Sequence, residues 1–200
     1  QLLVTVDFTP PSAPSVPDML PDSDSGASDS DNVTRINNPA FRGTGEANAL
    51  VRLYVVNVAG QSQLVGIGTV GSDESDGNPT NGVGVWEVTI EPLDDGVYVI
   101  YAEVEDQAGN ISSWSSGLMF EIDTYAPNTP YLDLITANDS GRNNVDNVTN
   151  DNTPIFTAAT SDPNAPIHIF ASNLRYRIYD RYEGSGDVLI YDSGALLNTN

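Results

Sequence analysis

An internal repeat limits the folds open to this chain. The sequence Asp31-Asn32-Val33-Thr34 recurs 115 residues later as Asp146-Asn147-Val148-Thr149. A low-complexity acidic tail would not keep residue order over such a span, so we interpret the chain as copies of one domain. Further matches in the same order are Ser25-Gly26 with Ser140-Gly141, Pro39 with Pro154, Phe41 with Phe156 and, at a spacing of 116, Val4-Thr5-Val6-Asp7 with Phe120-Glu121-Ile122-Asp123.

The repeat also sets the expected domain boundaries. Residues 1–8 match the end of the copy that closes at Asp123, so we interpret them as the last strand of a preceding repeat. Residues 9–123 form one complete Ig-like domain, and residues 124–200 form a second that is incomplete or interrupted. The chain starts without a basic segment followed by an apolar leader, so we expect its first residue to lie inside a longer protein.

Hydrophobic alternation predicts an all-β fold of tandem Ig-like antiparallel β-sandwich domains. Runs rich in β-branched and aromatic residues are separated by Gly, Pro, Asn and Asp, and helical spacing is absent. Tyr98 follows Asp95-Gly96 and has the position of a tyrosine corner, whose hydroxyl binds the preceding loop. The expected strands are 16–20, 39–43, 49–58, 63–70, 85–91, 97–105 and 118–122.

The charge of the chain excludes several partners. Its formal net charge is −21, with 28 acidic and 7 basic residues, and every basic residue is Arg. Such a surface repels the phosphates of nucleic acids and anionic membranes, so we expect neither partner for this segment. No run of about 18 apolar residues occurs. The chain also contains no Cys, so disulfides do not stabilise it, and we expect a monomer.

Residues 22–34, with the sequence DSDSGASDSDNVT, are the leading candidate for a metal site. The segment is either a solvated acidic surface or a site for a hard cation, and its return in the second copy favours the cation. Asp and Asn oxygens suit Ca²⁺ better than Mg²⁺ or a transition metal. An EF-hand is not predicted, because Val33 stands where that loop needs Glu. The candidate ligands are Asp22, Asp24, Asp29 and Asp31 in the first copy and Asp139, Asp146 and Asp151 in the second.

An Ig-like strand order would place these acids at the joints between copies. We call the end where the chain reaches a domain its incoming pole, and the end where it leaves its outgoing pole. Converging carboxylates repel one another, and a calcium ion with about six to eight oxygen ligands would turn this repulsion into a clamp. At the joint between the two copies, the expected ligands are Asp24, Asp29, Asp31 and Asp123, with Asp162 opposite. The joint before the first copy would use Asp7, Asp106 and Asn110, and the joint after the second copy would use Asp139, Asp146 and Asp151.

Three motifs, at residues 25–41, 95–110 and 122–127, resemble the bacterial Ig-like repeats of giant RTX-type surface adhesins. The resemblance implies extracellular extender domains, arranged in tandem with neighbouring repeats of the same chain as partners. It implies export by type I secretion, display on the bacterial cell surface, and Ca²⁺ as the ion that keeps the repeats rigid. It further implies a role in cell adhesion or biofilm formation, with other modules binding a glycan or a surface.

Catalysis is not predicted. No nucleophile–base motif or phosphate-binding loop occurs, and the single histidine, His168, lies in the apolar run I-H-I-F. The alternative to a spacer is a carbohydrate- or surface-binding β-sandwich module. Trp86 alternates as a core residue does, whereas Trp114 is open to either packing or ligand binding.

A cluster of Arg and Tyr near the end of the chain has two interpretations. It is a binding face, or a strand surface on which Arg offsets nearby acid and Tyr packs, and we favour the strand surface. The residues are Arg175, Arg177, Tyr179 and Arg181.

Overall fold

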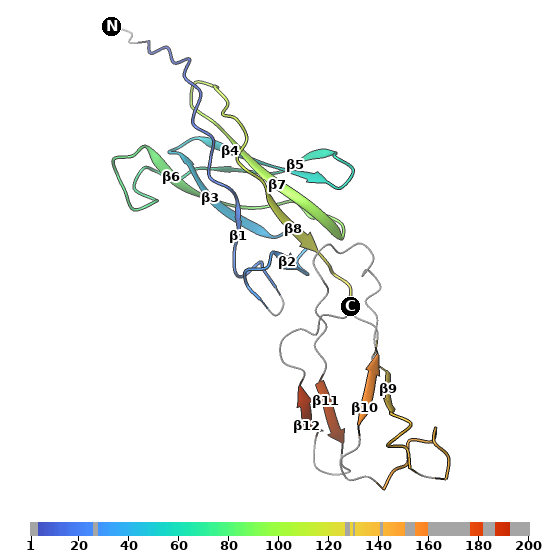
Figure 1. Cartoon of the computed structure of the whole chain (residues 1–200). Helices are drawn as coiled ribbons and strands as arrows, with labels where there is room; N and C mark the ends of the chain where they lie inside the picture. The colour runs from blue at the N-terminus through green and yellow to red at the C-terminus, as the bar shows by residue number, and fades with distance from the viewer. Residues whose placement is uncertain are drawn as a thin grey trace. The chain divides into compact units, whose positions relative to one another are not determined.

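The computed structural model describes residues 4–25, 28–126, 129, 131–140, 142–150, 155–159, 177–181 and 187–192. The chain divides into two units, Gln1–Thr124 and Tyr125–Asn200 (Figure 1). Regular structure in the described residues consists of strands. None of these residues forms a helix with the length and apolarity needed to cross a bilayer.

The five long runs expected from the sequence are all strands of the first unit. Each observed strand begins and ends within two residues of its predicted limits. The two shorter strands differ more, since the first keeps two residues of the expected 16–20, and the second continues past Gly43 to Glu46. The strands are β1 (Asp18–Met19), β2 (Val33–Thr34), β3 (Ala40–Glu46), β4 (Leu50–Asn57), β5 (Ser62–Thr69), β6 (Val83–Thr89), β7 (Gly96–Glu105) and β8 (Leu118–Ile122).

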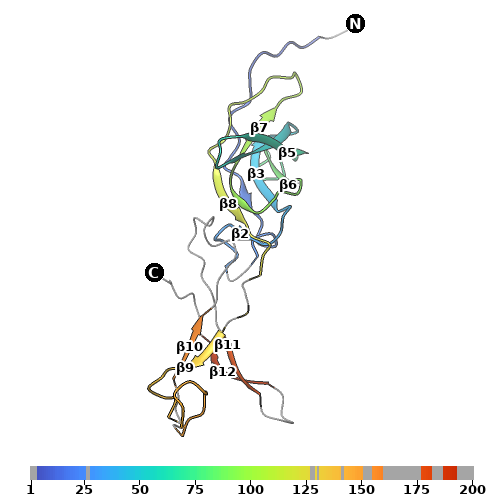
Figure 2. The same ribbon diagram turned by 90° about the vertical axis from the view of Figure 1, so that its right-hand side faces the viewer.

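These strands form the two sheets of an Ig-like sandwich, seen from two directions in Figures 1 and 2. One sheet has the order β1-β3-β6 and the other the order β2-β8-β7-β4-β5. All pairs are antiparallel except β2 with β8, which is parallel. The predicted fold class is therefore confirmed.

Apolar side chains from both sheets fill the space between them. Phe41 of β3 and Phe120 of β8 meet edge to face with their ring centroids 5.1 Å apart, and neither is exposed. Trp86 of β6 is 1% exposed, as its alternation predicted. Its ring lies over Gly43, its partner in the β3–β6 register, where a Cβ atom would overlap the indole. Each fully buried side chain of this size contributes about 1.5–3 kcal/mol.

Two details of the first unit concern its loops. The hydroxyl of Tyr98 donates to the carbonyl oxygen of Asp94 at 2.9 Å, which confirms the tyrosine corner. The acidic segment, expected as a structured loop, also contains the short strand β2. The backbone N–H of Asp123 donates to the carbonyl oxygen of Thr34 at 2.8 Å, so this part of the loop joins the sheet of β8. The loop thus crosses from one sheet to the other.

The second unit repeats the beginning of the first. Its strand β9 (Tyr131–Leu134) pairs with β10 (Phe156–Ala159) so that Leu134 faces Phe156. Met19 faces Phe41 in the same way, 115 residues earlier. The strands β11 (Arg177–Arg181) and β12 (Asp187–Asp192) form a separate antiparallel pair.

The register of β11 and β12 bears on the Arg and Tyr cluster. Arg177 pairs with Asp192, and Arg181 pairs with Asp187. The backbone therefore sets a basic position opposite an acidic one at both ends of the pair, as the strand-surface interpretation expects. Arg175 and His168 lie outside the described residues.

Candidate metal site

The acidic loop is closed by hydrogen bonds between its two ends. The backbone N–H groups of Ser23 and Asp24 donate to the carbonyl oxygen of Leu20, which makes a tight turn directly after β1. The hydroxyl of Thr34 donates to the carbonyl oxygen of Ser23. Thr34 is 1% exposed. The chain from 20 to 34 is therefore anchored to both sheets at the outgoing pole.

Asp24 is the buried carboxylate of this loop, at 5% exposure. Its Oδ2 accepts the backbone N–H of Asn32 at 3.0 Å. Its Oδ1 is buried and has no hydrogen-bond partner among the described residues. Burial raises the pKa of Asp24, and the N–H of Asn32 lowers it in part. The negative charge of Asp31, the interaction of its side chain with the Asp24 carboxyl, and the charge of Asp29 raise the pKa further. An unpaired buried oxygen of this kind is costly, at about 1–3 kcal/mol and more when it is charged.

The second unit contains the same arrangement. Asp139 is 4% exposed, and its Oδ2 accepts the backbone N–H of Asn147 at 3.2 Å. Its Oδ1 is likewise buried without a hydrogen-bond partner in the described part of the chain. Asn32 and Asn147 both have a φ of 59°, a left-handed conformation that Asn adopts more readily than most residues. Two copies of the loop, different in sequence, thus leave the same carboxylate oxygen unpaired.

The other aspartates of the first loop differ in their surroundings. Asp31 lies near Asp24, and its Oδ1 accepts the backbone N–H of Val33 at 3.1 Å. Asp22, Asp29 and Asp31 are all exposed. Within the described ranges, no three Asp, Glu, His or Cys side chains gather closely enough to hold a metal ion. A cation at Asp24 would need Asp31, backbone carbonyl oxygens and water to complete its oxygen ligands, a donor set that suits Ca²⁺.

The incoming pole brings together Asp7, Asp106 and Asn110, the residues predicted for the joint before this domain. The side-chain amide of Asn110 donates to the carbonyl oxygen of Asp7 at 3.3 Å and to Oδ2 of Asp106 at 2.8 Å. Oδ1 of Asp106 accepts the backbone N–H groups of Ala108 and Asn110, both at 2.8 Å. These bonds lower the pKa of Asp106, the side chain of Asn110 having the largest effect. Its own turn therefore already stabilises this carboxylate.

Sequence reasoning missed Glu46 at the same pole. With Asp7 and Asp106 it lines a cavity of about 420 Å³. Burial raises the pKa of Glu46, and the charges of Asp106 and Asp7 raise it further. No local pattern could have linked Glu46 to Asp106, since the two are 60 residues apart and meet only through the sheet.

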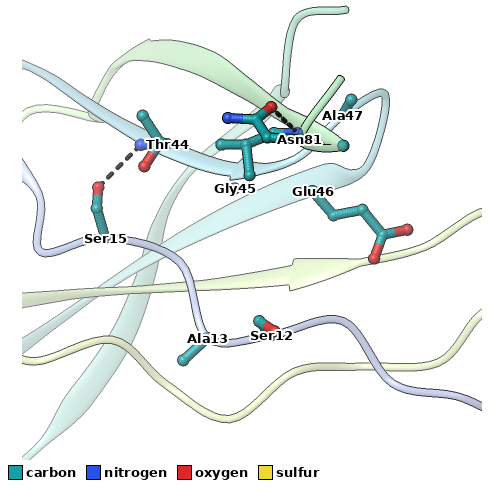
Figure 3. Close-up of a pocket in the computed structure, with 10 residues that line it drawn as sticks. Ser12, Ala13, Ser15, Thr44, Gly45, Glu46, Ala47 and Asn81 are labelled. Carbon is teal, nitrogen blue, oxygen red and sulfur yellow. Dashed lines mark hydrogen bonds between the residues drawn. The ribbon is translucent and has the colours of Figure 1, made fainter. Parts of the chain in front are cut away.

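A second cavity, of about 550 Å³, adjoins the first and shares Glu46 and Ala47 with it (Figure 3). The hydroxyl of Ser15 accepts the backbone N–H of Thr44 at 2.8 Å, and Oδ1 of Asn81 accepts that of Val83 at 2.9 Å. Among the described residues that line it, Glu46 is the one ionisable side chain. A lining of this kind offers no nucleophile–base pair, so we do not interpret the cavity as an active site.

The remaining predicted ligands divide into two groups. Asp123 directly follows β8 at the outgoing pole, where its backbone N–H is bonded to the end of the acidic loop. Asp146 accepts the backbone N–H of Val148 at 3.2 Å, as Asp31 does for Val33. Asp151 and Asp162 lie outside the described residues, and their assignment to calcium at the joints stays a prediction.

Comparison with known proteins bears on the first unit. The family model for the bacterial Ig-like domain matches residues 10–124, which include β1 to β8, the acidic loop and both poles. No curated protein matches the chain.

Proposed function

The chain belongs to the bacterial Ig-like domain family, and on this premise we propose that it is a calcium-stabilised spacer of a bacterial cell-surface adhesin. Its domains would hold a ligand-binding module away from the cell for adhesion or biofilm formation. A spacer needs rigidity and repetition, and it needs no catalytic residues. Export by type I secretion and an extracellular location belong to the same proposal, because calcium is plentiful outside the cell.

The unpaired Oδ1 of Asp24, repeated in Asp139, is the observation that carries the proposal. A buried carboxylate that keeps one oxygen unpaired is normally neutralised by a proton, a basic side chain or a cation. In the described part of the chain no basic side chain forms an ion pair with either residue. A calcium ion would supply the missing charge, and the neighbouring Asp31 and Asp146 would supply further oxygen atoms.

Calcium would also stabilise the folded chain by reducing its net negative charge. At −21 the folded chain repels itself, and a divalent ion at each loop would reduce that repulsion. An ion at a hundred-fold excess over its Kd stabilises the folded state by about 2.7 kcal/mol per site. This is a large fraction of the stability of a typical domain, which is about 5–15 kcal/mol in total.

The joints between domains would carry further ions. We propose that Asp123 and Asp162 contribute at the joint between the two copies, and Asp7, Asp106, Asn110 and Glu46 at the joint before the first. Since Asp106 is already well bonded, this site would bind more weakly than the site at Asp24.

Calorimetric titration of the whole chain with calcium tests the proposal. We expect binding that is lost stepwise in the variants Asp24→Asn and Asp139→Asn, and kept in Glu87→Gln, which removes an exposed carboxylate from β6. Small-angle scattering should show a stiffer particle with calcium than with a chelator. Equal heats of binding in all variants would place the ions elsewhere, and no binding at millimolar calcium would end the proposal.

A further inference from the structure

An aromatic platform lies on the outer face of the five-stranded sheet. Tyr54 of β4 and Tyr101 of β7 face each other in the register, and the indole of Trp114 lies over both rings. The centroid of Trp114 is 5.2 Å from that of Tyr54 with an angle of 17° between the planes, and 5.1 Å from that of Tyr101 with an angle of 37°. One face of the indole is therefore covered by tyrosine, while Trp114 remains 40% exposed.

Hydrogen bonds hold the platform in place. The indole Nε1–H of Trp114 donates to Oε2 of Glu103 at 2.9 Å, and the hydroxyl of Tyr54 donates to Oε1 of the same carboxylate at 3.0 Å. Arg52 forms an ion pair with Glu103 at 3.8 Å. A side chain fixed in this way loses little conformational freedom when a ligand binds, which favours binding.

The segment that carries Trp114 is equally well anchored. The backbone N–H groups of Ser112 and Ser115 donate to the carbonyl oxygens of Val104 and Ala102 at 2.9 and 2.8 Å. Their hydroxyl oxygens accept the N–H groups of the same two residues, both at 3.0 Å. Trp114 therefore sits between two double hydrogen-bonded anchors on β7, which position its ring.

Packing alone does not account for this arrangement. Trp86, the tryptophan that serves the core, is 1% exposed, whereas Trp114 turns a flat ring to solvent. Its one polar atom is already bonded to Glu103, so what the ring offers is the apolar face of a π-system. Exposed aromatic groups with polar side chains at their edge are typical of ligand-binding surfaces.

We propose that Trp114 and the side chains around it bind a neutral polysaccharide, one pyranose ring stacking on the exposed indole face. The C–H face of a pyranose is flat and apolar, and its hydroxyl groups would find Arg52, Glu103 and Glu105 at the edge of the platform. Arg52 forms ion pairs with both glutamates and a hydrogen bond with Glu105, which hold these polar groups in place.

Charge and composition of the face favour a neutral sugar over other occupants. The net charge of −21 repels acidic polysaccharides. The ion pairs of Arg52 with Glu103 and Glu105 interrupt the apolar surface, which a protein interface would need to be continuous at its centre. This inference does not depend on calcium and goes beyond the role of a spacer.

Nuclear magnetic resonance of the whole chain tests the proposal with cellohexaose, laminarihexaose, mannohexaose and xylohexaose as probes. With at least one probe we expect the indole N–H resonance of Trp114 to shift on titration, while that of the buried Trp86 does not. Trp114→Ala should weaken the binding at least tenfold. Val85→Ala, which removes a partly exposed apolar side chain from the other sheet, should leave it unchanged.

Several results would overturn the proposal. These are no shift with any probe at millimolar concentration, shifts that leave Trp114 unaffected, or a preference for an acidic polysaccharide such as alginate. Dimerisation that Trp114→Ala abolishes, without any effect of sugar, would assign the platform to a second copy of the chain instead. Because the resonance of the unaltered chain is the primary readout, the test does not rely on the variant folding well.

Discussion

Replacing Asp24 with Asn should change stability in opposite directions with and without calcium. In the unaltered chain Oδ1 of Asp24 is buried and unpaired, and Asp31 and Asp29 add negative charge nearby. Asn keeps an oxygen for the N–H of Asn32 and places an amide nitrogen where it can donate to Asp31. Without calcium the variant should therefore be more stable by about 1 kcal/mol, the low end of the cost of an unpaired buried group.

With calcium the order should reverse. At the proposed site, a calcium ion in hundred-fold excess over its Kd would stabilise the unaltered domain by about 2.7 kcal/mol, and the variant would lack most of this. The net loss is then about 1.7 kcal/mol. For a domain of this size, this corresponds to a melting temperature roughly 5–10 °C below that of the unaltered chain.

Thermal melts followed by circular dichroism measure both effects, with each protein in a chelator and in millimolar calcium. Glu87→Gln is the matched control, because it removes an exposed negative charge from β6 and should keep the full calcium shift. Two outcomes would refute the reasoning. One is a calcium shift in Asp24→Asn as large as in the unaltered chain, and the other is a variant that is the less stable protein in the chelator.

Three further predictions concern the first unit. Folding raises the pKa of Asp24 above its ordinary value of 3.8. In the absence of calcium, the contribution of Asp24 to the free energy of unfolding is therefore greatest below pH 3.8 and is lost as the pH rises. Thermal melts between pH 3 and pH 7 should show a shallower loss of stability with rising pH in Asp24→Asn than in the unaltered chain, and equal slopes would contradict this. Gly43→Ala should lower the free energy of unfolding in urea by about 1–3 kcal/mol, since the new Cβ overlaps Trp86; a change below 0.5 kcal/mol would show that the ring moves aside freely. Tyr98→Phe removes the bond to the Asp94 carbonyl and should cost about 0.5–1.5 kcal/mol in the same assay, whereas an unchanged midpoint would mean that the corner adds nothing.

The sequence predicted the sandwich because each strand carries its own signal. Alternation in the run that contains Trp86 identified the buried face of β6, and the Asp-Gly turn before Tyr98 identified the corner. The strand β2 was missed for the opposite reason. Its two residues have no pattern of their own, and their pairing is decided by β8, nearly 90 residues further along the chain.

The candidate site was predicted in outline but not in detail. Composition alone gives no reason to rank the four aspartates of residues 22–34 as metal ligands. Only the fold shows that Asp24 is buried while Asp22 and Asp29 are exposed. Aligning the copies at their spacing of 115 would have narrowed the choice, because Asp24 and Asp31 align with aspartates, whereas Asp22 aligns with Ala137 and Asp29 with Asn144. Glu46 could not have been found in this way.

Position in the fold explains why one aspartate would respond to calcium more than another. Asp106 at the incoming pole has its oxygen atoms bonded within its own turn, and its pKa is lowered. Asp24 sits where the chain leaves the sheet of β1 and crosses to that of β2, and its Oδ2 already bonds the far side of that crossing through Asn32. A cation at Oδ1 would therefore tie the two sheets together at the end where the chain leaves the domain. Since a spacer is loaded along its length, an ion at this crossing would resist the separation of the sheets under tension, an effect that a cation held by the Asp106 turn alone could not have.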